Sequence, residues 1–285
     1  MATLSSRRIA LLESRHCGDL ATLVRRLGGE PVSAPAVDEV PCHNDFNVFL
    51  DGLVERRFSL AIFQTGTGIR TLFTEADRRG RLAQVIDALR HTTVACRGAK
   101  PQAVLRRYGL RPQVTTAKPH TTQELLHALA HQDVAERGVL LVHYGERNVE
   151  VAEAVRQRGA RLEEVCPYEW ALPDNLEPLT AVIRAVVSRR LDAVLFTSQI
   201  QCRHLFQVAA DLGLTHALAT GLNREIVVGA VGPVCAARLR ELGVTPDVMP
   251  GAPNMAALIT ALAEYFDLVD AARGGSDRGR EARDL

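Results

Sequence analysis

Residues 60–70 read Leu60-Ala61-Ile62-Phe63-Gln64-Thr65-Gly66-Thr67-Gly68-Ile69-Arg70, and this stretch indicates the fold. Its first part, Leu60–Phe63, is a continuous apolar run, which is typical of a strand that is buried on both faces. Small and hydroxylated residues follow, and then the amphipathic stretch Ile69–Arg78 begins. A buried strand, a glycine-bearing junction and a helix in this order predict one unit of a parallel sheet.

The same pattern recurs along the whole chain. Apolar strand-like runs occur at Arg8–Leu12, Leu60–Phe63, Thr92–Cys96, Val139–Val142, Ala193–Phe196 and Ile226–Val231. Weaker strand signals occur at Pro31–Ala34, Pro112–Thr115, Leu162–Cys166 and Pro246–Met249. Amphipathic stretches such as Asp19–Leu27 and Val149–Arg158 follow the apolar runs. We therefore predict an α/β protein in which helices cover both faces of parallel sheets.

Two proline-bearing segments, residues 35–41 and 167–176, divide this pattern. Because they are far apart in the sequence, they predict a discontinuous arrangement. Residues 1–34 together with 177–268 form domain 1, and residues 42–166 form domain 2. We expect each domain to be a doubly wound parallel sheet, with the two segments forming a two-stranded connector and a cleft lying between the domains.

Composition limits the class of protein. The chain has 285 residues, is 47% hydrophobic and 24% charged, and has a net charge of +1. It can therefore build a large core, and its overall charge gives no reason to expect nucleic acid as a partner. The 6 cysteines form no C-x-x-C pair, no signal peptide is evident, and no apolar run reaches the roughly 18 residues of a membrane span. We predict a reduced, cytoplasmic protein that does not bind a membrane, with a disordered tail at 269–285.

The junctions after the strands are the candidate site, because ligands of open α/β sheets bind outside the carboxyl ends of the strands. Helix N-termini there present unpaired N–H groups and partial positive charge, which suits anions. The alternative is that these residues serve only as ordinary helix caps and turn glycines. The candidate binding residues are Thr65, Gly66, Thr67, Gly68, Arg97, Gly98, Ala99, Lys100, Tyr144, Gly145, Thr197, Ser198, Gly232, Pro233, Val234 and Asn254.

Common catalytic and cofactor motifs do not fit. The junction at residues 65–68 lacks the Gly-Lys-Ser/Thr of a phosphate-binding loop and the third glycine of a dinucleotide fingerprint. His127 and His131 lie four positions apart, but no glutamate lies between them as in a zinc protease. No Gly-x-Ser-x-Gly elbow occurs. The tyrosines Tyr144 and Tyr168 end strands and are candidates to project a phenol into the cleft, with an amphipathic interface role as the alternative.

The junction segments also occur in an order that is typical of a known family. They are Gln64–Arg70, Cys96–Lys100, Leu141–Gly145, Pro167-Tyr168, Phe196–Ser198, Ala230–Val234 and Leu239–Pro246. On these segments residues 7–268 resemble the uroporphyrinogen-III synthase family, especially a branch with Thr-Gly-x-Gly-like and Arg-Gly-Ala-Lys segments. The fold of that family is two doubly wound domains, one of them discontinuous, joined by a two-stranded connector, which agrees with the division above.

The resemblance implies a reaction that needs no metal and no cofactor. Hydroxymethylbilane, a linear tetrapyrrole of haem biosynthesis, is cyclised with inversion of its fourth ring and loss of water. This polycarboxylate substrate suits N–H groups at helix N-termini. By position, Tyr168 matches the tyrosine that assists departure of the hydroxyl, so it is the candidate catalytic residue. Thr65, Ser198 and Gly232 match substrate-contacting positions, and we expect a monomer.

The chain departs from the family pattern at two positions. Val234 follows Gly-Pro where the family usually has threonine, so one hydroxyl donor is missing. Asn254 stands where threonine or serine is common and still suits a helix cap. Relatives of this branch also occur fused to DNA-binding regulatory domains. Two interpretations therefore remain: a synthase, favoured by Tyr168, and a non-catalytic tetrapyrrole- or anion-sensing regulatory protein on the same two-domain fold, favoured by Val234.

Overall fold

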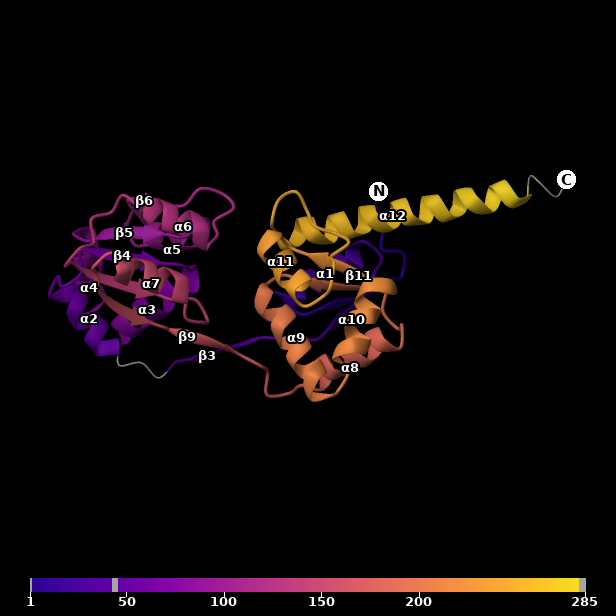
Figure 1. Ribbon diagram of the computed structural model, residues 1–285, viewed down its shortest axis with the longest axis horizontal. Coiled ribbons are helices and arrows are strands. Elements are labelled where there is room, and N and C mark those ends of the chain that lie inside the picture. The colour runs from indigo at the N-terminus through magenta and orange to yellow at the C-terminus, as the bar shows by residue number, and fades with distance from the viewer. Residues whose placement is uncertain (1, 43–45, 282–285) are drawn as a thin grey trace. The chain divides into compact units, whose positions relative to one another are not determined.

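The computed structural model describes residues 2–42 and 46–281, with side chains through residue 272, and it divides into two compact units (Figure 1). Unit 1 comprises Met1–Asp38 and Ala171–Leu285, and unit 2 comprises Glu39–Trp170. The chain passes between the units at residues 38–39 and 170–171, within the segments expected to connect domains. Two short strands there, β3 (Asp38–Pro41) and β9 (Tyr168–Ala171), pair as a separate two-stranded sheet.

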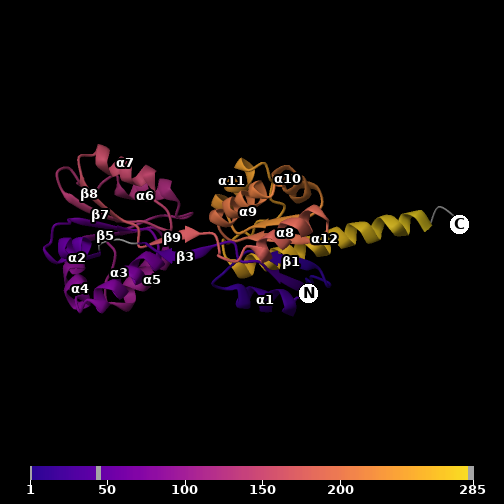
Figure 2. The same cartoon turned by 90° about the horizontal axis from the view of Figure 1, so that it is seen from below.

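Unit 1 contains a parallel sheet of four strands in the order β11-β10-β1-β2. The strands are β1 (Arg8–Leu11), β2 (Glu30–Ser33), β10 (Ala193–Phe196) and β11 (Val227–Ala230). Successive residues of a strand pack into the cores on opposite faces of the sheet. Ile9 packs with α1 (Cys17–Arg26) and α12 (Met255–Glu281), whereas Ala10 packs on the opposite face. That face is covered by α8 (Glu177–Val187), α9 (Gln199–Asp211), α10 (Thr215–Arg224) and α11 (Pro233–Glu241) (Figure 2).

Unit 2 is built in the same way around a parallel sheet of five strands in the order β6-β5-β4-β7-β8. The strands are β4 (Leu60–Phe63), β5 (Thr93–Cys96), β6 (Val114–Thr115), β7 (Gly138–Val142) and β8 (Arg161–Val165). One face carries α2 (Phe46–Val54), α3 (Gly66–Arg78), α4 (Leu82–Arg90) and α5 (Ala99–Arg107). The other carries α6 (Thr122–Leu129) and α7 (Val149–Gln157) (Figure 2). Because both faces are covered, β4 is apolar throughout, as the sequence predicts.

The strand order places a switch point in the middle of each sheet. In unit 2 the chain starts at β4, adds β5 and β6 on one side, and then adds β7 and β8 on the other. In unit 1 it starts at β1, adds β2 on one side, and later adds β10 and β11 on the other. Connections therefore diverge beyond the carboxyl ends of β4 and β7, and beyond those of β1 and β10. Doubly wound sheets bind ligands at such points.

Two expectations about local structure are wrong. The segment Pro246–Met249 forms no strand and contributes a single bridge between Val248 and Gly229; Pro246 and Pro250 at its ends lack the N–H that a ladder needs. The predicted disordered tail continues α12 through Glu281. The buried part of α12, with Leu262 and Phe266 in the core, has already nucleated the helix, so the polar residues beyond it need only extend it. Residues 282–285 lie outside the described residues.

Among the residues that the structure describes, none of the helices combines the length and apolar character that crossing a membrane requires.

Candidate functional site

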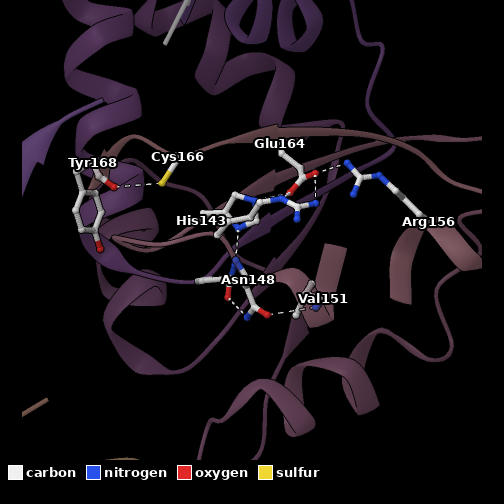
Figure 3. Close-up of polar contacts among 9 residues, drawn as sticks. His143, Asn148, Val151, Arg156, Glu164, Cys166 and Tyr168 are labelled. Carbon is white, nitrogen blue, oxygen red and sulfur yellow. Dashed lines mark hydrogen bonds and ion pairs between the residues drawn. The ribbon is translucent and has the colours of Figure 1, made fainter. Parts of the chain in front are cut away.

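The phenol of Tyr168 lies against the first turn of α3. Thr65 follows β4 and caps this helix, since its side-chain oxygen accepts a hydrogen bond from the Gly68 N–H at 3.1 Å. The same oxygen lies 3.3 Å from the Tyr168 hydroxyl oxygen. Tyr168 is only 5% exposed, and the Cys166 thiol donates to its backbone carbonyl (Figure 3). The structure thus places the predicted catalytic residue in contact with a predicted binding residue.

The glycines of α3 allow two other junctions to approach its N-terminus. A Cβ atom at Gly66 would lie 3.1 Å from the carbonyl oxygen of Lys100, and one at Gly68 would lie 3.3 Å from that of His143. Larger residues would push these junctions apart. The junctions after β4, β5 and β7 therefore meet at the carboxyl edge of the sheet. The predicted residues that they bring to this edge are Thr65, Gly66, Thr67, Gly68, Arg97, Gly98, Ala99, Lys100, Tyr144 and Gly145.

An aromatic cluster supports the arginine at this edge. The Arg97 guanidinium lies 4.3 Å from the centre of the Tyr144 ring, and the Tyr144 ring packs edge-on against Trp170 with centroids 5.4 Å apart. Gly145 has a φ of 50°, and a Cβ atom there would overlap the Trp170 ring at 2.2 Å, so only glycine fits. The Trp170 backbone N–H also donates to the Gly145 carbonyl at 2.9 Å. Among the described residues Arg97 has no carboxylate partner, which leaves its N–H groups available for an anion.

A polar network holds the junction after β7 in place (Figure 3). His143 is 2% exposed, and its Nδ1 accepts from the Asn148 backbone N–H at 3.1 Å. Its Nε2 must therefore carry the proton, which it donates to Glu164 at 2.8 Å. Arg147 and Arg156 pair with the same carboxylate. The segment that carries Tyr144 and Gly145 is thus fixed at both ends.

Asn148 continues this network into the core. Its side-chain oxygen caps α7 by accepting from the Val151 N–H at 3.2 Å. Its amide donates to Gln64 Oε1 at 2.8 Å and to the Thr122 hydroxyl at 3.1 Å. Gln64 is 2% exposed, and its Nε2 has no hydrogen-bond partner among the described residues. One side chain therefore links α7, the residue before Thr65, and the start of α6.

The charges of this network shift two pKa values. Burial lowers the pKa of His143, which outweighs the opposite effect of Glu164 and keeps the imidazole neutral. Burial of Glu164 would raise its pKa. Hydrogen bonds from Arg147, His143 and Arg156 outweigh that effect and hold the pKa at about 2, below its ordinary value of 4.5.

Stability at acid pH is expected to depend on Glu164. Because its pKa is lower in the folded state than in the unfolded chain, its contribution is present above the ordinary value of 4.5 and is lost as the pH falls toward about 2. Urea unfolding at about pH 5.5 and about pH 3 measures this loss. Glu164→Gln should be less stable than wild type at the higher pH and should lose less on acidification. Glu153→Gln, which removes an exposed carboxylate of α7, should behave as wild type. Equal acid sensitivity of wild type and Glu164→Gln would contradict this role.

Thr197 follows β10 at the carboxyl edge of the unit 1 sheet, and its hydroxyl is hydrogen-bonded. It donates to the Glu13 carboxylate at 2.5 Å. Gln201, on the first turns of α9, donates to the same carboxylate oxygen at 3.2 Å. The Gln201 side-chain oxygen accepts from the Thr197 backbone N–H at 2.7 Å. The predicted binding residue Thr197 is thus part of a cluster around a carboxylate that the sequence reasoning did not include.

The remaining predicted residues of unit 1 lie at helix starts. Ser198 precedes α9 in extended conformation, and its side chain makes no cap hydrogen bond. Gly232 precedes α11, and a Cβ atom there would lie 3.1 Å from Pro253, so the junction at Gly232–Val234 meets the start of α12. Asn254 caps α12 by accepting from the Ala257 N–H at 2.8 Å. Pro233 and Val234 begin α11, and Val234 is 47% exposed.

Sequence reasoning missed Glu13, Gln64, His143, Asn148, Glu164 and Trp170. Glu13 and His143 occupy strand-to-helix junctions, so their position alone was a signal. The roles of Asn148 and Trp170 depend on contacts distant in sequence, which the pattern does not reveal.

Known proteins are similar to this chain over most of its length. A family model described as "Uroporphyrinogen-III synthase HemD" matches residues 18–260. An uncharacterised Bacillus subtilis protein, YjjA, is 29% identical over 93% of this chain and 97% of its own. A putative uroporphyrinogen-III synthase of Methanothermobacter thermautotrophicus is 25% identical over 86% of this chain and 94% of its own. A crystal structure of a mutant uroporphyrinogen III synthase from Thermus thermophilus is similar, with a TM-score of 0.75 and 25% identity, over 92% of this chain and 99% of that one.

Proposed function

The chain belongs to the uroporphyrinogen-III synthase family, and we propose that it cyclises hydroxymethylbilane to uroporphyrinogen III with inversion of ring D and loss of water. The observation that carries the proposal is the contact between Tyr168 and Thr65. It places a phenol beside the first turn of α3, at the switch point of the unit 2 sheet. The reaction needs a hydrogen-bond donor for the leaving hydroxyl, which the phenol supplies. It also needs N–H groups for the substrate carboxylates, which the first turn of the helix supplies.

Tyr168 assists the first step. The C–O bond of the hydroxymethyl group breaks, and the hydroxyl takes up a proton and leaves as water. A phenol that donates a hydrogen bond to this oxygen stabilises the charge that develops on it. The α-carbon of ring D that already carries the methylene bridge to ring C attacks the azafulvene cation, and a spiro centre forms. The bond between this carbon and the ring C methylene then breaks, which leaves a second azafulvene cation on ring C, and the other α-carbon of ring D bonds to this methylene. Loss of a proton gives the neutral macrocycle with ring D inverted, so the net change is the loss of one water molecule.

Thr65 positions the phenol. Its oxygen accepts one hydrogen bond from the Gly68 N–H, so the hydroxyl that faces Tyr168 is fixed by the helix cap. Holding the donor in one orientation avoids reorganisation during the reaction.

The basic groups of the same edge bind the carboxylates. Arg97 is held on the Tyr144 ring, and Lys100 is exposed in the first turn of α5. Guanidinium groups bind carboxylates with two parallel hydrogen bonds, and helix N-termini add unpaired N–H groups. A polycarboxylate therefore finds several separate donors at one sheet edge.

Val234 supports a second function, a tetrapyrrole- or anion-sensing protein without turnover. It is 47% exposed at the start of α11, where a threonine would offer a hydroxyl. Turnover separates the two functions. A synthase given freshly prepared hydroxymethylbilane yields isomer III, whereas a sensor leaves isomer I from spontaneous closure.

Binding of a polycarboxylate tetrapyrrole is expected in either case and should raise the melting temperature. Saturating uroporphyrinogen III stabilises the folded state by mass action. The shift should shrink at high salt, because the exposed part of the attraction to Arg97 and Lys100 is screened. A differential scanning measurement under anaerobic conditions, at low and at high salt, tests this. An Arg97→Gln variant should show a smaller shift than an Arg161→Gln control, which lies at the start of β8. Equal shifts in both variants would remove Arg97 from the site.

A further inference from the structure

Glu13 lies at the switch point of the unit 1 sheet. It comes directly after the residue that follows β1, and its carboxylate accepts a hydrogen bond from Thr197, the first residue after β10. Strands β1 and β10 are neighbours, and their connections diverge to opposite sides. Glu13 is the only carboxylate that lies within two residues after a described strand of either parallel sheet. It therefore occupies the place where a doubly wound sheet binds a ligand.

Neutral donors hold this carboxylate in one orientation. Thr197 and Gln201 both donate to Oε2, at 2.5 and 3.2 Å. Gln201 is 3% exposed, and its own oxygen is satisfied by the Thr197 backbone N–H. Burying a side-chain amide costs desolvation free energy unless its polar atoms are hydrogen-bonded. Here both of its polar atoms are used to hold Thr197 and Glu13.

The other oxygen of this carboxylate has no partner among the described residues. No arginine, lysine or histidine pairs with Glu13 in the part of the chain that the structure describes, and its Oε1 has no hydrogen-bond partner there. Glu13 is partly exposed, and its Oε1 is not one of the buried side-chain atoms without a partner, so this oxygen is available to a ligand.

A negative charge at this edge repels the carboxylates of a polycarboxylate ligand. It suits the opposite kind of group, namely an N–H donor or a cation. Hydroxymethylbilane has both, since its pyrroles carry N–H groups and its cyclisation passes through an azafulvene cation. We propose that the Glu13 carboxylate accepts hydrogen bonds from pyrrole N–H groups and stabilises this cation, with Thr197 and Gln201 as its positioning residues.

This inference rests on the proposed function. An azafulvene cation forms when the C–O bond breaks, forms again when ring D separates from the ring C methylene, and disappears when the last C–C bond to ring D forms and a proton leaves. A fixed carboxylate therefore contributes more to the transition state than to the neutral product.

Glu13→Gln tests the charge while it keeps the shape of the side chain. We expect kcat for isomer III to fall about ten- to a hundredfold, whereas the dissociation constant of uroporphyrinogen III, which carries no cation, changes less than about twofold. Glu13→Asp keeps the charge and should retain clearly more activity than Glu13→Gln. Glu30→Gln, at the amino-terminal end of β2 and exposed, should match wild type. Urea unfolding of each variant shows which of them are folded.

The outcomes separate this inference from the proposed function. Wild type that forms no isomer III overturns both. Active wild type with a Glu13→Gln variant of unchanged kcat overturns only the role of Glu13. Equal losses in Glu13→Gln and Glu13→Asp, or a loss that follows the weakened binding of uroporphyrinogen III, show that the residue holds the structure and not the cation. A fall in kcat with binding intact, partly restored by aspartate, supports the proposal.

Discussion

Replacing Tyr168 by phenylalanine is expected to lower the rate of isomer III formation about ten- to a hundredfold. The variant keeps the buried ring and removes only the hydroxyl that lies 3.3 Å from Thr65. Loss of one preorganised donor to a leaving group raises a barrier by about 1–3 kcal/mol. Because substrate that is not captured closes spontaneously to isomer I, the fraction of isomer I should rise as well. Initial rates and the isomer ratio, measured on freshly prepared hydroxymethylbilane, give both quantities.

Tyr108→Phe is the matched control for this variant. It removes the hydroxyl of a tyrosine in the same unit, where the ring packs against Phe73 at the end of α5. Its rate and isomer ratio should equal those of wild type. A folded Tyr168→Phe protein with the wild-type rate and ratio would exclude this hydroxyl from the reaction.

Replacing Asn148 by alanine is expected to destabilise the protein by about 2–4 kcal/mol. The substitution removes the cap of α7, which accounts for about 1 kcal/mol. It also leaves the buried Gln64 Oε1 without its donor, at about 1–3 kcal/mol more, in a place where Gln64 Nε2 already lacks a partner. Urea unfolding followed by circular dichroism measures the change in free energy.

Asn254→Ala provides the comparison. Asn254 also caps a helix, but it is exposed and caps the first turn of α12 alone. The loss should be about 1 kcal/mol. If both substitutions cost the same, the buried hydrogen bonds of Asn148 contribute nothing beyond the cap.

The parallel sheets could be predicted because their strands carry the signal locally. Leu60–Phe63 and Ala193–Phe196 are apolar at every position, which is the pattern of strands covered on both faces. The glycine-bearing junction at residues 65–68 likewise marks the carboxyl edge. The sequence does not predict the full length of α12, because the polar composition after Phe266 resembles that of a disordered segment. Extension of a helix depends instead on the nucleus that its buried turns supply.

The site was less predictable, because its supporting contacts join distant parts of the chain. The sequence pattern favours small and hydroxylated residues as anion donors, so it points to Thr197 and not to Glu13. Only the strand order, with β1 beside β10, shows that the two residues meet. The role of Trp170 could not be predicted for the same reason, because it depends on how the junction at Gly145 folds against it.

We propose that this chain directs ring closure, and the isomer composition of the product measures this activity most directly. Freshly prepared hydroxymethylbilane is incubated with wild-type protein, the porphyrinogens are oxidised, and the type I and type III uroporphyrins are separated. A parallel reaction without protein gives the spontaneous isomer I. We predict that type III predominates with wild type and that its yield rises in proportion to protein concentration. Wild-type protein that binds uroporphyrinogen III but yields only type I would contradict a role in ring closure. That result would favour the second function, a tetrapyrrole-sensing protein without turnover.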